Sequence, residues 1–160
     1  MEIIGYKCFN KDMTNRYGKE IEIGKIYTAN GNIKVGNDSH GYHFCKNMED
    51  TFRYFDAMND EVSVCLVKGT GIIDEYEDDY NGYYNIYASE HIEILKKLTR
   101  EEIIIYALNL NEIRVCRFVQ GFKLTNDEME LFKEKFSGSS NVLKYINYYQ
   151  LRNIDAFKSL

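Results

Sequence analysis

Histidine and cysteine side chains that could bind a metal gather in one short segment, His40–Cys45, which reads His-Gly-Tyr-His-Phe-Cys. On an extended strand His43 and Cys45 point to the same face, because side chains alternate with a period of two. Imidazole and thiolate are ligands that Zn²⁺ prefers, and Cys8 is available to complete a tetrahedron. The spacing matches no standard zinc motif. We therefore expect no metal, and interpret the cysteine as a core residue and His43 as a hydrogen-bonded residue at a sheet rim.

The same segment supports a second hypothesis, a nucleotide pocket. In its order of elements, with Tyr6-Lys7 early and Gly41–Phe44 directly before a helix, the chain loosely resembles ADP-ribosyltransferase-like folds. That resemblance implies NAD as a cofactor, with Tyr42 stacking on nicotinamide and His43 bonding a ribose hydroxyl. Glu90, or Glu93, would support the positive charge that develops on the ribose. The implied ligand pocket is Tyr6, Lys7, Tyr42 and His43, with His43 and Glu90 as the catalytic residues.

Acidic residues and tyrosines alternate along a second segment, Asp74–Tyr84. Its spacing partly matches a calcium loop, but Ala88 stands where such a loop requires a bidentate glutamate. Two interpretations stay open: a solvated hairpin tip with Asn81-Gly82 as its turn, and a surface that binds a basic protein partner. In the second, carboxylates steer the partner and tyrosines anchor it at low entropy cost. The candidate binding residues are Tyr76, Asp78, Asp79, Tyr80, Tyr83 and Tyr84.

The elements that must position these residues fall into two parts. Residues 1–98 alternate in the manner of short strands, among them 42–45, 62–67 and 71–73, with one short helix beginning at Met48. Asn30-Gly31 predicts a hairpin between residues 26–28 and 33–35. Residues 99–160 contain two capping boxes, which begin at Thr99 and Thr125 and predict helices. We expect an α+β fold, a small mostly antiparallel sheet with one short helix, followed by a helical C-terminal subdomain packed on it.

The helical part contains two similar stretches, residues 115–124 and 142–151. One interpretation is a pair of stacked helical hairpins, although two copies are fewer than a free-standing solenoid needs. The other is that any two amphipathic helices look this similar.

The first part resembles an uncharacterised domain family of bacterial and phage proteins, sometimes found ahead of pentapeptide repeats. The resemblance covers about the first 100 residues and rests on the pattern GYKxF, GKxY and GxHFC, which appears here as Gly5–Phe9, Gly24–Tyr27 and Gly41–Cys45. It implies a phage or mobile-element context and points to no particular activity. The acidic run Asp74–Asp79 departs from the short basic stretch expected there.

Composition limits the remaining classes of function. The chain has 160 residues and a formal net charge of −5, which disfavours nucleic-acid binding because phosphate backbones are also negative. No 18-residue apolar run or signal peptide is evident, and the four cysteines form no CxxC pair, so we expect a cytoplasmic protein with free thiols. The leading hypothesis is a non-enzymatic protein-interaction module, and the alternative is an NAD-dependent transferase. Whether the chain is an enzyme, and its oligomeric state, stay open.

Overall fold

The computed structural model describes residues 1–36, 39–78 and 84–151, and these belong to two compact units. Unit 1 comprises Met1–Phe55 and Glu61–Leu98. Unit 2 comprises Asp56–Asp60 and the chain from Thr99 onward. The short segment 56–60 therefore leaves the strand-rich part of the sequence and joins the helical one.

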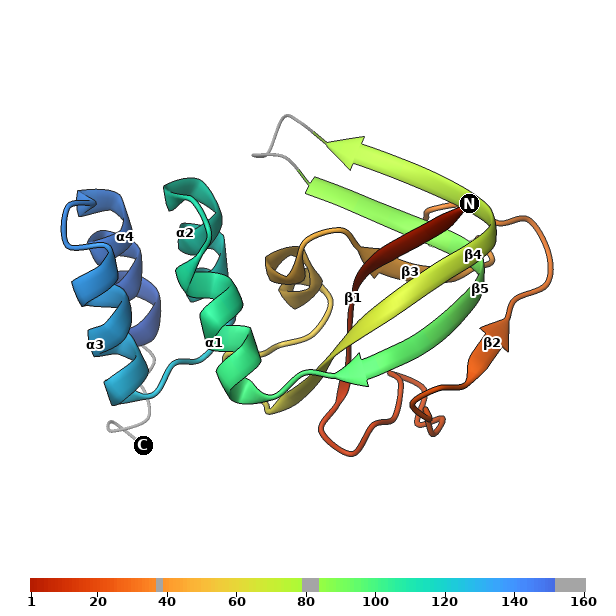
Figure 1. The fold of residues 1–160 in the computed structure, drawn as a ribbon, viewed down its shortest axis with the longest axis horizontal. Coiled ribbons are helices and arrows are strands. Elements are labelled where there is room, and N and C mark those ends of the chain that lie inside the picture. Colours follow the sequence, from red (N-terminus) through yellow and green to blue (C-terminus); the bar gives the residue numbers. More distant parts are fainter. Residues whose placement is uncertain (37–38, 79–83, 152–160) are drawn as a thin grey trace. The chain divides into compact units, whose positions relative to one another are not determined.

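Unit 1 is a five-stranded antiparallel sheet that closes on itself (Figure 1). Its strands are β1 (Glu2–Asn10), β2 (Ile26–Thr28), β3 (Tyr42–Cys45), β4 (Val62–Asp78) and β5 (Tyr84–Lys97). β4 pairs with β1 and β5, β5 also pairs with β3 and β2, and β3 returns to β1 through Tyr6 and Cys45. Together with the helices that follow, this confirms the α+β class.

Phe44 fills the space inside the closed sheet, where its ring lies 5.3 Å from that of Tyr87. Two glycines leave room for it. A Cβ atom on Gly69 would stand 2.7 Å from the Phe44 ring, and one on Gly5 would also meet Phe44 and the Cys45 carbonyl. Because real Cβ contacts are not this short, glycine at these positions is a requirement of the packing.

One short helix, η1 (Met48–Arg53), follows β3 directly, as the sequence predicted, and it is a 3₁₀ helix. Asn47 precedes it in an extended conformation but makes no side-chain capping bond. The helix packs on the outer side of β1, where the Cys8 thiol lies 3.1 Å from the Thr51 hydroxyl. Packing, and not a cap, therefore holds this helix in place.

Two strand predictions were wrong in detail. Asn30-Gly31 does not join neighbouring strands, because β2 pairs with β5 and residue 33 makes only an isolated parallel bridge to His40. The extended pieces 62–67 and 71–73 are not separate strands either. They form one long β4, which continues through the acidic run to Asp78 and bends at an irregularity between Thr70 and Ile73.

Unit 2 consists of helices α1 (Arg100–Leu108), α2 (Glu112–Gly121), α3 (Asn126–Lys135) and α4 (Ser140–Tyr145), and a π-helical turn η2 (Ile146–Leu151). Both predicted capping boxes are present, Thr99 with Glu102 and Thr125 with Glu128. α2 packs against α4 and η2, and α1 contacts α2 and α3. The two similar stretches therefore lie on elements that pack against each other, one on α2 and the other on α4 and η2. Within the described residues no helix has both the length and the apolar character needed to cross a membrane.

The buried side chain of Gln150 connects η2 to the end of α2 and to the residues that follow it. Gln150, with 0% of its surface exposed, donates to the carbonyls of Val119 and Phe122 at 2.6 and 2.7 Å. Its Oε1 accepts from the Leu124 amide at 2.9 Å. The end of α2 and the chain that follows it thus depend on one amide from η2.

Candidate functional site

The outer part of β4 is an open sheet edge. β1 covers one side of β4 only as far as the pair Glu2 and Thr70, whereas β5 covers the other side as far as Asp78. From Ile72 to Tyr76, no strand pairs with the outer side of β4 within the described chain, and Figure 1 shows this end of β4 with β5 alone beside it. An unpaired strand edge presents backbone N–H and C=O groups that can receive another strand.

The carboxylates on one face of this edge are held in place. Asn85 of β5, with 0% of its surface exposed, donates its Nδ2 to Glu75 Oε1 at 3.0 Å and to Glu77 Oε1 at 3.2 Å. The Asn85 Oδ1 is buried and has no hydrogen-bond partner within the described residues. The two carboxylates therefore lie together, and a pair of exposed carboxylates suits a cationic donor.

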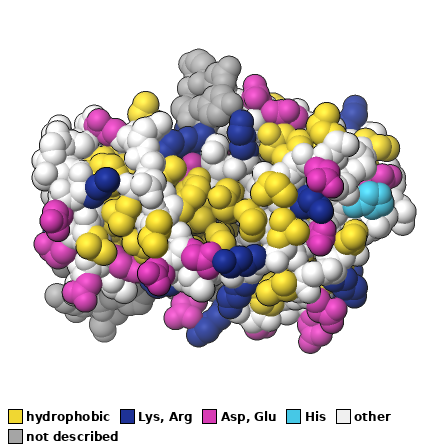
Figure 2. Space-filling model, viewed as in Figure 1, with side chains coloured by type: hydrophobic (Ala, Val, Ile, Leu, Met, Phe, Trp, Pro, Cys, Tyr) yellow, Lys and Arg dark blue, Asp and Glu magenta, His cyan; other side chains and the backbone are white. Residues whose placement is uncertain are grey.

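The opposite face carries Tyr76, which is 50% exposed, and Asp74, whose Oδ2 accepts from the Val35 amide at 2.9 Å. Ile72, just before it along β4, is 60% exposed. Figure 2 shows hydrophobic side chains over β1 and β4, interrupted by acidic and basic ones. We name residues 72–78 of β4, together with Asn85, the acidic edge.

The remaining hairpin candidates divide into two groups. Tyr84 is buried and structural, since its ring lies under the Arg53 guanidinium at 4.2 Å and beside the Tyr54 ring at 6.4 Å. Asp79, Tyr80 and Tyr83 lie outside the described residues. Tyr76 and Asp78 are thus the two candidates that the structure places on the acidic edge itself.

The candidate ligand pocket centres on Lys7 and His43, and the structure brings these two residues together. The Lys7 ammonium donates to the His43 backbone carbonyl, and its Nζ lies 5.9 Å from the centre of the Phe9 ring. Burial, and secondarily the charge of Arg16, lowers the pKa of Lys7 to about 8. The His43 Nε2 lies 3.2 Å from the Gly36 amide, which donates to it. Burial and the Lys7 charge together lower the pKa of His43.

The other pocket candidates have separate surroundings. Tyr6 neighbours Lys7 on β1 and therefore faces the other side of the strand, and burial followed by Glu49 raises its pKa. Tyr42 packs at the core with its ring 6.3 Å from that of Tyr27. The Glu90 carboxylate lies 3.2 Å from the ring of His91. Lys7 and His43 thus meet through a backbone carbonyl, while Tyr6, Tyr42 and Glu90 make their contacts elsewhere.

No group of three or more histidine, cysteine, aspartate or glutamate side chains is placed to hold a metal in the part of the chain that the structure describes. The thiols of Cys8 and Cys45 are buried, and burial raises the pKa of both, that of Cys8 to about 12. Protonated thiols are poor ligands and poor nucleophiles.

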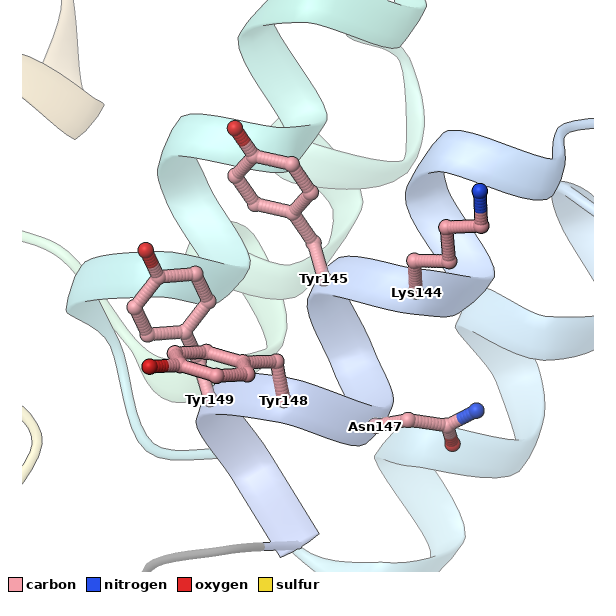
Figure 3. Close-up of a pocket in the computed structure, with 5 residues that line it drawn as sticks. All are labelled: Lys144, Tyr145, Asn147, Tyr148 and Tyr149. Atoms are coloured by element: carbon pink, nitrogen blue, oxygen red, sulfur yellow. The ribbon is translucent and has the colours of Figure 1, made fainter.

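Unit 2 has a shallow pocket of its own, lined by Lys144, Tyr145, Asn147, Tyr148 and Tyr149 (Figure 3). All five residues come from α4 and η2. The Tyr148 and Tyr149 rings meet edge to face at 4.8 Å, and Tyr148 is 54% exposed. A pocket lined by one continuous helical segment is open on most sides, so it offers a contact surface and not an enclosed cavity.

Sequence reasoning missed the central features of the acidic edge. Asn85 was not singled out, although an asparagine among tyrosines and isoleucines in a strand is a signal of a buried polar contact. The open edge itself has no local signal, because it depends on where β1 ends against β4. The partial burial of Lys7 also has no local signal beyond its place between Gly5 and Phe9 on the strand.

Comparison with known proteins adds a family. A family model described as "Domain of unknown function (DUF7666)" matches residues 3–106, which span unit 1 and the beginning of α1. No curated protein matches the chain, and no solved structure does.

Proposed function

The chain belongs to the DUF7666 family of domains of unknown function, and we propose that it is a protein-interaction module that binds a basic segment of another protein at the acidic edge. The observation that carries this proposal is the coincidence of an open strand edge with two carboxylates that Asn85 holds in position. A phage or mobile-element context and a cytoplasmic location are part of the same proposal.

Charge and exposure support a basic partner. The acidic edge carries Asp74, Glu75, Glu77 and Asp78 within five consecutive residues, and the whole chain has a net charge of −5. A concentrated negative surface speeds the encounter with a basic partner and repels an acidic one. Tyr76, half exposed among these carboxylates, provides the aromatic contact that binding surfaces commonly use.

The surroundings of the Lys7 and His43 pair support a non-enzymatic role. The Lys7 ammonium donates to the His43 backbone carbonyl, and the His43 imidazole accepts a hydrogen bond from the Gly36 backbone amide. Each group is thus engaged in an internal contact with the backbone. A catalytic constellation would instead direct several such groups at one vacant position.

The experiment is a binding titration followed by nuclear magnetic resonance, with a terminally blocked hexalysine peptide as the probe and a hexaglutamate peptide as the control. We expect saturable binding of hexalysine at physiological salt, with amide shifts concentrated on the acidic edge. The double variant Glu75→Gln, Glu77→Gln should weaken binding about tenfold, because it removes two of the edge's charges. The matched variant Glu101→Gln, Glu134→Gln neutralises two exposed carboxylates of unit 2 and should bind as the parent does. Equal loss in both variants, or shifts spread over both units, would contradict the proposal.

A further inference from the structure

We infer that the partner binds as an added β-strand along Ile72–Tyr76, with a lysine or arginine seated over Glu75 and Glu77. This inference rests on the proposed function and specifies its partner, an extended segment in which basic and apolar residues alternate. It adds backbone hydrogen bonds to the charge attraction that the proposed function requires.

The first observation behind this inference is the ordered backbone of β4. Between Ile73 and Tyr76 every residue has a partner on β5, so this stretch is held in a regular extended conformation. In an antiparallel ladder the N–H and C=O groups of alternate residues point to opposite sides. Half of these residues therefore direct both groups away from β5. Since no described strand pairs with that side, an incoming strand finds an ordered template and does not have to order β4 itself.

The second observation is the placement of two carboxylates on one face of β4. Glu75 and Glu77 lie two residues apart on one face, and both accept from the same Asn85 amide. A carboxylate has about four acceptor sites, and the bond to Asn85 occupies one of them. Residues at alternate positions of an added strand face one side of the sheet, and basic side chains at two such positions would lie opposite Glu75 and Glu77.

The third observation is the exposed ring of Tyr76. It lies on the other face of β4, and half of its surface is exposed. The residue of the partner strand between two basic residues would face this ring. A β-branched residue suits that place, because aromatic and β-branched residues form favourable cross-strand pairs. The preferred partner is therefore a segment of the pattern basic, β-branched, basic.

The test uses the blocked peptide Val-Lys-Val-Lys-Val-Lys-Val and two versions of it, one N-methylated at the valines and one N-methylated at the lysines. All three carry the same charge, but methylation removes the donors on one edge of the peptide strand. Which edge matters depends on the direction in which the peptide binds. We expect at least one methylated version to bind about tenfold more weakly than the parent peptide, because it loses two or more backbone hydrogen bonds. Hydrogen exchange of protein amides between Ile72 and Tyr76 should slow when the parent peptide is bound.

The outcomes separate the two proposals. If all three peptides bind equally well, or if the slowed amides lie away from β4, the added strand is refuted while binding of a basic partner stands. If neither these peptides nor hexalysine binds, the proposed function fails and the added strand fails with it. A Glu-Val peptide of the same pattern serves as the charge control, and binding of it as strong as that of the lysine peptide would refute the seating of a cation on Glu75 and Glu77.

Discussion

Asn85 donates its side-chain amide to Glu75 over 3.0 Å from a position with no exposed surface. The bond connects the interior of unit 1 to the carboxylates of the acidic edge, and Glu77 shares the same amide. A buried polar group that is anchored to exposed carboxylates fixes where those charges lie. This fixed position makes the edge more than a strand with acidic side chains.

Replacing Asn85 by aspartate should destabilise unit 1 by about 2–4 kcal/mol near pH 7, because it places a buried negative charge beside two others. Burial raises the pKa of the new carboxyl in the folded state above its unfolded value of about 4, so the folded state binds more protons. The deficit should therefore be small below about pH 4 and grow as the pH rises. Urea unfolding at both ends of this range measures it. Asn85→Leu is the control, and a pH-dependent deficit of the same size there would refute the explanation.

Lys7→Met should raise the stability of unit 1 near neutral pH by about 1–2 kcal/mol, since it removes a charge that burial disfavours. The folded pKa of Lys7 is about 8, below its unfolded value of 10.5, so the unfolded state binds more protons between these values. The parent should therefore gain stability as the pH rises through this window, and the advantage of Lys7→Met should shrink there. Lys11→Met, at an exposed position, should show no such trend. An unchanged or reduced stability of Lys7→Met near pH 7 would show that the bond to the His43 carbonyl outweighs the cost of burial.

The lowered pKa of His43 predicts a loss of stability in weak acid. The folded state favours the neutral imidazole, so its contribution is present above the unfolded pKa of about 6.5 and is lost as the pH falls toward the lower folded pKa. His43→Ala should unfold at a lower temperature than the parent near pH 7, because the Gly36 amide loses its acceptor. Its melting temperature should then fall less than that of the parent between about pH 7 and 5. Calorimetry of both proteins, with exposed His40→Ala as the control, decides the matter; equal slopes would refute it.

Gln150→Ala should destabilise unit 2 by about 2–4 kcal/mol, because two buried carbonyls and one buried amide lose their partner. Urea unfolding followed by far-ultraviolet circular dichroism measures the loss of helix. Asn147→Ala removes an amide of the same kind from an exposed position of η2 and should change stability by less than about 0.5 kcal/mol. Similar losses in the two variants would indicate that the helix end, and not the buried hydrogen bonds, is responsible.

Gly69→Ala should destabilise unit 1 by about 1–3 kcal/mol through overpacking, since the added methyl would stand 2.7 Å from the Phe44 ring. In a chain that already carries Phe44→Leu, Gly69→Ala should cost less stability than it does in the parent, because the smaller leucine side chain leaves room for the added methyl. Thermal unfolding of the two single variants and the double variant measures the coupling. Strict additivity would show that Gly69 and Phe44 do not compete for space.

The sequence predicted those elements whose signals are local. The capping boxes at Thr99 and Thr125 are confirmed because a threonine and a glutamate three residues later form both hydrogen bonds within a single turn. The strand at residues 42–45, the short helix after it and the α+β class also follow from spacing within a few residues. Asn30-Gly31 failed as a hairpin signal: β2 pairs with the distant β5, where Tyr27 lies opposite the buried Ile92, and residue 33 makes only an isolated bridge to His40.

The sequence alone determined that the segment from Asp74 onward carries negative charge and aromatic side chains, since both properties follow directly from its residue types. Tertiary structure alone decided which of these residues are available. Tyr84 is buried under the Arg53 guanidinium, whereas Tyr76 is half exposed. Tyr76 lies on an edge that is open because the pairing of β1 with β4 ends at Thr70. Strand pairing joins residues far apart in sequence, so neither the open edge nor the approach of Asn85 to Glu75 has a local cause. The closure of β1 on β3 around Phe44, which places Lys7 beside the His43 carbonyl, has the same non-local origin.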